Sequence, residues 1–298
     1  MTRSITVEPS ARALTAERFI AGRGLFDQRR PLKRWRWVGV FCEELMLCAA
    51  KVSIGPARQT FWALHLPGEA MRERTRLLPR RGEVELHEGS PDGSCPGLVR
   101  IRWPVRGHRR LPVRHGVELD IELREQPGFE ARCPTGRSEA WTRKQAGIPA
   151  RGTLRLDGGP PRRLEALAVV DDSAGYHARV TEWRWSAGVG RTPDGTPLAW
   201  NLVSGVNDPP VGSERAIWVD GSPHEVPPVE FADDLGSIQA SDGSLLLFQP
   251  EAERRRRDNL LIVSSDYRAP FGTFSGVLPG GIELASGRGV MEWHRARW

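Results

Sequence analysis

The densest group of residues that could perform acid–base chemistry lies between positions 170 and 180. Asp171, Asp172, His177 and Arg179 follow directly on an apolar run. A carboxyl group at the mouth of an apolar barrel can act as a general acid when burial raises its pKa, and a nearby imidazole can share the proton. We therefore take Asp171, Asp172 and His177 as candidate catalytic residues and Arg179 as a ligand contact. The competing interpretation, which the sequence alone favours, is a strand-end turn capped by an aspartate that pairs with Arg179.

A second pair of polar residues lies near the C-terminus. In the segment 290–294, alternation places Glu292 and His294 on one face of a strand and Met291 and Trp293 on the other. If the polar pair points inward, a Glu–His pair lines the barrel and contacts the ligand. The expected orientation is outward, because most antiparallel strands keep their polar face in water.

The segment 266–276 alternates glycines with aromatic side chains and begins near Tyr267. Glycines in such a strand indicate a barrel bend or a close backbone approach, and a pocket floor has the same features. We favour the structural interpretation and keep Tyr267 as a candidate ligand contact. Asn201 and Glu214 stand beside apolar runs and are weaker candidates for inward-facing polar groups.

The sequence lacks the common motifs for bound cofactors. It has no G-x-G-x-x-G, P-loop, G-x-S-x-G or H-E-x-x-H motif. Its cysteines are Cys42, Cys48, Cys95 and Cys133. They form no C-x-x-C pair and have no histidine at zinc-ligand spacing, so we expect no metal and no cofactor. The first residues carry no apolar signal segment, which predicts a cytoplasmic protein with reduced thiols.

The sequence predicts that these residues lie on short strands. Val117–Leu123 alternates apolar and polar residues without a break, which predicts a strand with one buried and one wet face. Asp-Gly pairs at 157–158, 194–195, 220–221 and 242–243 mark turns between apolar runs. Many such runs predict an all-β barrel or sandwich protein with few short helices. The helices are expected at Ala11–Ile20, with Ser10 as N-cap, and at Pro250–Arg257.

One motif occurs twice. Trp35-Arg36-Trp37 recurs about half a chain later as Trp183-Arg184-Trp185. Gly-Val follows each copy closely, and a further tryptophan-bearing strand follows, with Trp62 and Trp200 respectively. The repeat predicts two related antiparallel β units in tandem. We expect a lead-in at residues 1–30, a first unit at 31–150 and a second at 151–298; separate barrels and one continuous sheet system both stay open.

The charge of the chain raises the question of nucleic acid as a partner. The formal net charge is +6 and the isoelectric point is about 9.7, a balance that suits nucleic acid. The basic residues are spread along the chain with acidic residues among them, and the densest run, 254–257, is flanked by Glu253 and Asp258. We interpret that run as a solvated face and expect no nucleic-acid partner. No run of about 18 apolar residues occurs, so no integral membrane segment is expected.

Several ordered motifs resemble a known family. They are Leu32–Trp37, Pro149–Thr153, Thr181-x-Trp183-x-Trp185 and Phe271–Gly276. The chain resembles the bacterial family catalogued as domain of unknown function 2804, over nearly its whole length from about Pro31. The family has no assigned activity. In its pattern of strands and tryptophans, the family is distantly similar to two-unit lipocalin-like proteins. That wider group includes carotenoid hydratases and cyclases of terpenoid or polyketide substrates. The resemblance implies an apolar barrel with a few acids, and it carries over no catalytic residue.

The leading hypothesis is a lipocalin-like protein that binds a hydrophobic small molecule such as a lipid, isoprenoid or polyketide. Eight-stranded barrels leave room for one small ligand, and apolar walls with a few polar groups are typical of binding sites. The walls are assigned to Trp183, Trp185 and Trp200. The polar contacts are assigned to Asp172, His177, Arg179, Asn201, Tyr267, Glu292 and His294.

Two alternatives stay open. The first is a cofactor-independent hydratase, isomerase or cyclase that uses carboxylate acid–base chemistry in the same pocket, which requires an acid with a raised pKa facing the cavity. The second is a scaffold whose tryptophans interlock as a filled core with no void for a ligand. The sequence does not specify the oligomeric state or the identity of the ligand.

Overall fold

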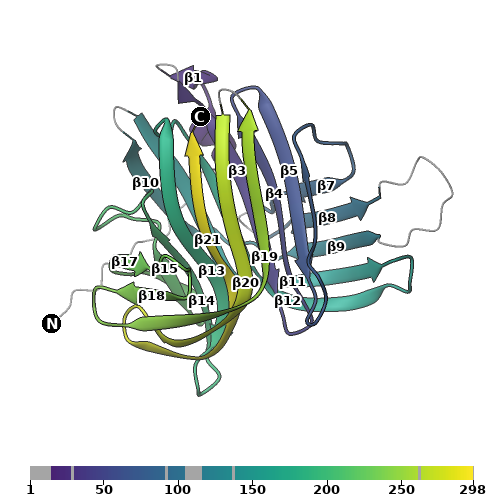
Figure 1. The fold of residues 1–298 in the computed structure, drawn as a ribbon, viewed down its shortest axis with the longest axis vertical. Helices are drawn as coiled ribbons and strands as arrows, with labels where there is room; N and C mark the ends of the chain where they lie inside the picture. Colours follow the sequence, from purple (N-terminus) through teal and green to yellow (C-terminus); the bar gives the residue numbers. More distant parts are fainter. Residues whose placement is uncertain are drawn as a thin grey trace.

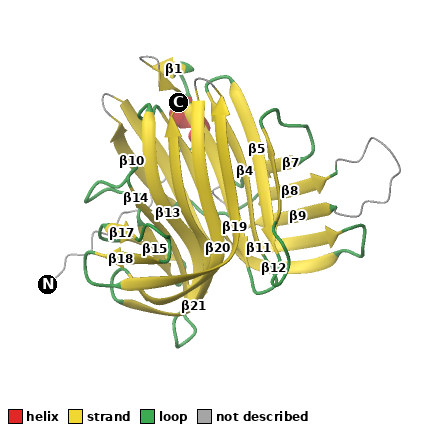
Figure 2. Ribbon diagram, viewed as in Figure 1, coloured by secondary structure: helices red, strands yellow, loops and turns green. Residues whose placement is uncertain are grey.

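The computed structural model describes residues 15–27, 30–90, 93–104, 116–135, 138–260 and 263–297. About two thirds of these residues lie in strands, which pair antiparallel (Figure 2). The chain enters through a short helix, α1 (Ala16–Ile20), whose N-cap is Thr15; the Thr15 hydroxyl accepts a hydrogen bond from the Arg18 amide. The predicted helix is therefore present near its expected end, whereas the proposed cap, Ser10, lies outside the described residues. A small hairpin follows, β1 (Phe26–Asp27) and β2 (Arg30–Pro31).

The first large sheet contains the strands from β3 to β12. Their bounds are β3 (Lys33–Phe41), β4 (Met46–Ile54), β5 (Ala57–His65), β6 (Arg72–Arg76), β7 (Val84–His87), β8 (Gly97–Trp103), β9 (Val117–Leu123), β10 (Phe129–Thr135), β11 (Ser138–Leu156) and β12 (Arg162–Gly175). The order in space is β6-β5-β4-β3-β12-β11-β9-β8-β7, and β10 pairs with β11. The chain thus runs outward from β3 to one edge, continues at the other edge and returns to the centre at β12 (Figure 1).

The second large sheet repeats this topology. Its strands are β13 (Val180–Arg191), β14 (Pro197–Ser204), β15 (Ala216–Val219), β16 (Ser222–Glu225), β17 (Val229–Phe231), β18 (Ser237–Ala240), β19 (Leu245–Leu260), β20 (Val263–Leu278) and β21 (Ile282–Arg297). Their order is β16-β15-β14-β13-β21-β20-β19-β18-β17. Position by position, β3 corresponds to β13 and β12 corresponds to β21. The protein is therefore all-β, with two tandem lipocalin-like units, as predicted.

The repeated Trp-Arg-Trp motif marks equivalent places in the two units. Trp35–Trp37 lies on β3, and Trp183–Trp185 lies on the corresponding strand β13. The repeat is less regular beyond this motif. Trp62 lies on β5, two strands from β3, whereas Trp200 lies on β14, next to β13. The duplication is thus real at the centre of each sheet and imperfect toward the edges.

The chain passes from the first sheet to the second at residues 176–179. β11 and β12, joined by the predicted Asp-Gly turn at 157–158, both belong to the first sheet, where β12 pairs with β3 along nine residue pairs. The expected boundary between residues 150 and 151 falls inside β11 and does not coincide with this change of sheet. The hairpin was assigned to the second unit because sequence alone does not show that its second strand returns to pair with the first strand of the first unit.

The helix predicted at Pro250–Arg257 is wrong. These residues belong to β19, and a register shift between Pro250 and Ala252 accommodates the proline against β20. Arg254 is buried and Arg256 half-buried, whereas Arg255 and Arg257 are exposed. The sequence does not reveal the alternation of this strand, because arginines occupy both its inward and its outward positions at 254–257.

Three large hydrophobic cores hold the molecule together, and a fourth, smaller one lies between α1 and the strands β11 and β12. One lies on the inner face of the first sheet and includes Val38, Val40 and Val170; another lies inside the second sheet around Trp200. The third, here called the junction core, joins residues of both sheets, among them Trp37 and Trp185. The central strands β3 and β13 are therefore covered on both faces. Within the described ranges, no helix is long and apolar enough to cross a membrane.

Candidate functional site

A cavity of about 200 Å³ lies in the junction between the two units rather than inside either one. Its walls come from β3, β4, β5 and β12 of the first sheet and from β13, β14, β19, β20 and β21 of the second. Most of the exposed wall is apolar, with the aromatic side chains of Trp35, Trp37, Phe61, Trp183 and Trp185. The cavity thus combines greasy walls with a small number of polar groups, the usual composition of a small-molecule site.

The two copies of the repeated motif face each other across this cavity. The Trp37 and Trp185 rings meet edge to face, with their centroids 4.9 Å apart. Because strand residues two apart share a face, Trp35 and Trp183 also point toward the cavity. The duplication therefore supplies matching aromatic walls from both sides.

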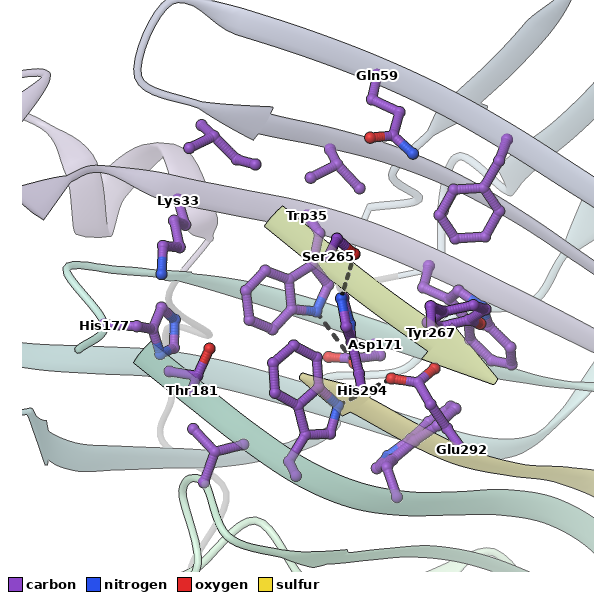
Figure 3. A pocket seen from close by; sticks show the side chains of 18 of the residues that line it. Lys33, Trp35, Gln59, Asp171, His177, Thr181, Ser265, Tyr267, Glu292 and His294 are labelled. Carbon is purple, nitrogen blue, oxygen red and sulfur yellow. Dashed lines mark hydrogen bonds between the residues drawn. The ribbon is translucent and has the colours of Figure 1, made fainter. Parts of the chain in front are cut away.

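Each unit also places a carboxyl group at the same register. Asp171 of β12 pairs with Trp37 in the ladder, and Glu292 of β21 pairs with Trp185. The Trp35 indole N–H donates to Asp171 Oδ2 over 3.1 Å, and the Trp183 indole N–H donates to Glu292 Oε1 over 2.8 Å (Figure 3). Two equivalent tryptophan–carboxyl pairs thus line one cavity.

A buried ammonium group distinguishes the first pair from the second. Lys144 of β11 forms an ion pair with Asp171 and lies 3.4 Å from Glu214 Oε1. Burial alone would lower the pKa of Lys144, but the two carboxyl groups outweigh it and raise this pKa. Burial raises the pKa of Glu214 itself, and Asn207 donates a hydrogen bond to its Oε2 over 3.0 Å. Lys144 therefore stays charged beside Asp171.

The second carboxyl group, Glu292, has an apolar neighbour where Asp171 has Lys144. Arg268 pairs with Trp293 in the ladder, which places Ala269 next to Glu292. Burial, with a smaller contribution from the charge of Asp171, raises the pKa of Glu292 to about 7. Glu292 can therefore gain and lose a proton near neutral pH.

The phenol of Tyr267 and the imidazole of His294 complete the surroundings of Glu292. Tyr267 donates a hydrogen bond to Glu292, and burial together with that carboxylate raises the pKa of the phenol. His294 Nε2 lies 2.8 Å from Ser265 Oγ. Burial, then the charges of Arg254 and Lys33, lower the pKa of His294 to about 3, so this ring is neutral at pH 7.

At the other end of the cavity, Lys33, His177 and Thr181 form a group that we call the polar end (Figure 3). The His177 ring is stacked against Trp35 at a centroid distance of 5.3 Å. Burial, then the charges of Lys33 and Lys144, lower the pKa of His177 to about 3. This imidazole is also neutral at pH 7, so it can exchange hydrogen bonds with a ligand without carrying charge.

Most of the predicted site residues line the cavity. They are Asp171, His177, Trp183, Trp185, Tyr267, Glu292 and His294. The expected outward orientation of Glu292 and His294 is wrong, because the first unit packs against the face of β21 that a lone sheet would leave in water. The alternation itself is confirmed, since Met291 and Trp293 pack into the second-unit core.

The other predicted residues lie outside the cavity. Asp172 points to the opposite face of β12 from Asp171, where it pairs with Arg36 at 2.8 Å and Arg143 at 2.7 Å inside the first unit. Trp200 is buried in the second-unit core and donates to Ser186 Oγ over 3.0 Å. Arg179 is exposed in the connection between the sheets.

Asn201 supports the site without lining it. Its Oδ1 accepts a hydrogen bond from the Trp185 indole over 2.8 Å, and its Nδ2 donates to the Glu214 carbonyl over 2.8 Å. Asn201 thus fixes one aromatic wall and the segment that carries Glu214.

Four residues at or beside the cavity are not predicted from the sequence: Lys33, Trp35, Lys144 and Arg254. The repeat could have identified Trp35 as the partner of Trp183. Arg254 lies over the rings of Phe61 and Tyr267, at 4.2 and 4.9 Å from their centroids, in a segment mistaken for a helix. No sequence pattern predicts Lys33 or Lys144 as site residues, because their contacts depend on which strands pack together.

The described residues contain no group of three or more His, Cys, Asp or Glu side chains placed to hold a metal ion. The acids that line the cavity among the described residues are Asp171, Glu214, Asp258 and Glu292, and each is engaged by hydrogen bonds or by an ion pair. The expectation of no metal and no cofactor stays a prediction.

Two solved structures share this fold across both units. A protein called AttH from Nitrosomonas europaea is 12% identical, covers 95% of this chain and 97% of its own, and has a TM-score of 0.55. Kievitone hydratase from Nectria haematococca is 11% identical, covers 98% of this chain and 95% of its own, and has a TM-score of 0.57. At such identities the likeness shows the fold alone. A search of curated proteins found no match.

The sequence also matches a family over nearly its whole length. The family is described as "Domain of unknown function (DUF2804)", and the match extends over residues 19–298. It therefore includes both sheets, the junction core and every residue that lines the cavity, and the chain belongs to the DUF2804 family.

Proposed function

We propose that the protein binds a hydrophobic small molecule in the cavity between its two units. The observation that carries this proposal is the cavity itself, about 200 Å³ and walled by tryptophans from both units. An apolar cavity of about 150 Å³ is enough to bind benzene. A filled-interior scaffold requires no void beside Trp183 and Trp185, whereas this cavity lies against both residues.

A cavity-filling substitution tests the binding. Val52 lines the cavity from β4 and is only half-buried, so Val52→Trp fills space with little strain on the core. Compounds extracted from the native protein are identified by mass spectrometry, and their affinities are measured by quenching of tryptophan fluorescence. We expect Val52→Trp to weaken binding by at least about tenfold, which is roughly 1.4 kcal/mol.

The matched control is Leu247→Trp, which adds the same side chain at an exposed position on β19 away from the cavity lining. It should bind as the wild type does. Equal affinity in the wild type, Val52→Trp and Leu247→Trp would place the ligand elsewhere and overturn the proposal.

We further propose that the bound molecule undergoes cofactor-independent proton transfer, as in a hydration, isomerisation or cyclisation. The observation that favours catalysis is the split between the two carboxyl groups: Asp171 is paired with Lys144, while Glu292 titrates near pH 7. A carboxyl group whose pKa is raised toward the working pH is well suited to act as a general acid. Kievitone hydratase, which shares the fold, is named for such a reaction.

In a hydration, protonated Glu292 delivers its proton to one carbon of a double bond. Positive charge then develops on the neighbouring carbon, where the Asp171 carboxylate and the faces of the indole rings stabilise it. A water oxygen bonds to that carbon, and the proton that the water loses returns to Glu292. The cycle consumes one water molecule and needs no oxidant or reductant.

Glu292→Gln tests this role, because it keeps the size of the side chain and removes the acidic carboxyl proton. Extracted compounds are incubated with the enzyme in deuterated water, and the gain of deuterium or water is followed by mass spectrometry. We expect loss of at least about a hundredfold in rate with ligand affinity kept. Glu283→Gln, on an exposed residue of the same strand, is the control and should leave the rate unchanged. Unchanged turnover in Glu292→Gln would end the catalytic proposal.

A further inference from the structure

The polar end of the cavity contains an amine. Lys33 is the first residue of β3, its side chain is 3% exposed, and it lines the cavity. Its Nζ donates to the Ala178 carbonyl over 3.4 Å, a long contact that leaves the head group near the ligand space. Figure 3 shows the Lys33 amine beside the His177 ring, across the cavity from Glu292 and Tyr267.

Lys33 differs from the other two lysines of the chain. Lys144 is fully buried and held as an ammonium group between Asp171 and Glu214. Lys51 is half-buried, donates to the Leu86 carbonyl over 3.1 Å and does not line the cavity. Lys33 is therefore the lysine whose side chain lines the space proposed for the ligand.

The neighbour of Lys33 is a polar atom that has no partner in the described part of the chain. His177 is 3% exposed, and its Nε2 makes no hydrogen bond to any described residue. A buried nitrogen of this kind costs stability unless a bound molecule satisfies it. An amine and an unsatisfied imidazole at one end of an apolar cavity suit a ligand with a terminal oxygen function.

We propose that Lys33 attaches an apolar aldehyde or ketone in the cavity as a reversible imine. This inference rests on the proposed function, because it assigns the chemical class of the cavity's occupant. The Lys33 nitrogen attacks the carbonyl carbon, forming a C–N bond as the C=O π bond breaks. The carbonyl oxygen then leaves as water with the two N–H protons, which the neutral His177 ring can relay. The step changes no oxidation state and needs no further reactant.

The electrostatics of the site agree with this role. Burial, then the nearby charge of Arg30, lower the pKa of Lys33 to about 7. A large share of this amine is therefore uncharged and nucleophilic at neutral pH, unlike an ordinary lysine.

Reductive trapping with benzaldehyde tests the proposal. The full-length protein is incubated with benzaldehyde and sodium cyanoborohydride at neutral pH, then examined by intact mass and peptide mapping. We expect one main adduct, heavier by the mass of the aldehyde less one oxygen atom, located on Lys33. Excess toluene should slow the labelling by competing for the cavity.

Matched variants separate the lysines. Lys33→Arg keeps a long basic side chain but has no amine that can form an imine, so it should abolish the main adduct, whereas Lys51→Arg should leave it unchanged. Label shared between Lys51 and the N-terminal amine in the wild type, with none favoured at Lys33, overturns the proposal. The wild-type peptide map decides this even if Lys33→Arg fails to fold.

Benzyl alcohol separates failure of this inference from failure of the proposed function. It has the ring of benzaldehyde but no carbonyl group, and its binding is measured by quenching of tryptophan fluorescence. Binding of benzyl alcohol without an adduct on Lys33 would refute the imine and leave the apolar site standing. Absence of both binding and adduct would refute both. Glu292→Gln should still form the adduct, because Glu292 lies at the other end.

Discussion

At the residue scale, the central feature is the carboxyl group of Glu292, whose neighbour on the adjacent strand, Ala269, carries no charge. Glu292 and Asp171 occupy equivalent registers and accept equivalent indole hydrogen bonds. Lys144 beside one and Ala269 beside the other make them different acids. Asp171 thus has a charged ladder partner, whereas burial raises the pKa of Glu292.

The pKa of Glu292 gives a direct spectroscopic prediction. Its Oε1 accepts the Trp183 indole N–H, so ionisation of Glu292 should move the NMR resonance of that N–H. We expect the shift to have a midpoint near pH 7, and Trp183→Phe assigns the signal. Glu292→Gln should remove the titration. A resonance that moves only near pH 4.5, the ordinary value for glutamate, would show that Glu292 is not perturbed.

The same pKa predicts how Glu292 affects stability. The folded protein holds the Glu292 proton more tightly than the unfolded chain does, so this contribution is complete below pH 4.5 and lost as the pH rises to about 7. Relative to Glu292→Gln, the wild type should lose on the order of 3 kcal/mol of unfolding free energy over this interval. Urea denaturation of both proteins at several pH values measures the difference. Parallel profiles for the two proteins would contradict the prediction.

At the element scale, the central strands work because both faces are packed and leave little room for extra atoms. On β13, a Cβ added to Gly188 would lie 2.3 Å from Trp200 Cζ2 and 2.7 Å from the Arg288 carbonyl oxygen. The carbonyl belongs to the paired strand β21 and has little freedom to move. A glycine here is therefore a packing requirement of the sheet.

Substitution of this glycine should destabilise the second unit. We expect Gly188→Ala to cost about 1–3 kcal/mol through overpacking, measured by urea denaturation. Gly24→Ala is the control, since its Cβ would meet its nearest atom at 3.4 Å, an ordinary contact, and it should change stability little. Equal stability of the two variants would show that β13 and β21 can separate without cost.

The strands were more predictable than their partners. Alternation identified Val117–Leu123 and the face shared by Glu292 and His294, because both patterns are local. It failed at Pro250–Arg257, where charged residues occupy both faces of β19. It also failed to show that Glu292 points into a cavity, since the cover over that face comes from β3 and β4, more than two hundred residues away in sequence.

At the scale of the whole molecule, the cavity that we propose as the binding site lies where the two units meet. The junction core draws residues from both sheets, and so does the cavity lining. The interiors of the units are filled by their own side chains. The tandem arrangement is therefore what creates the cavity.

Separating the units should expose the junction core. We expect fragments 1–178 and 179–298, expressed alone, to bind an apolar dye such as anilinonaphthalene sulfonate and to self-associate, because large exposed apolar patches do so. Co-expression should suppress both effects and restore the ligand site. Size-exclusion chromatography and dye fluorescence measure the outcome. Fragments that stay monomeric without binding the dye would show that the junction contributes little to folding.

The imperfect duplication has a stereochemical consequence. Two identical units facing each other would enclose a space with equivalent ends, and a ligand could enter it in either of two opposite orientations with the same energy. Lys144 lies behind one side only, and Lys33 with His177 occupies one end only. The two ends of the space therefore differ in charge, which favours one orientation of an unsymmetrical ligand over the reverse. A prochiral molecule held there presents one face to Glu292, so any product should form as a single enantiomer.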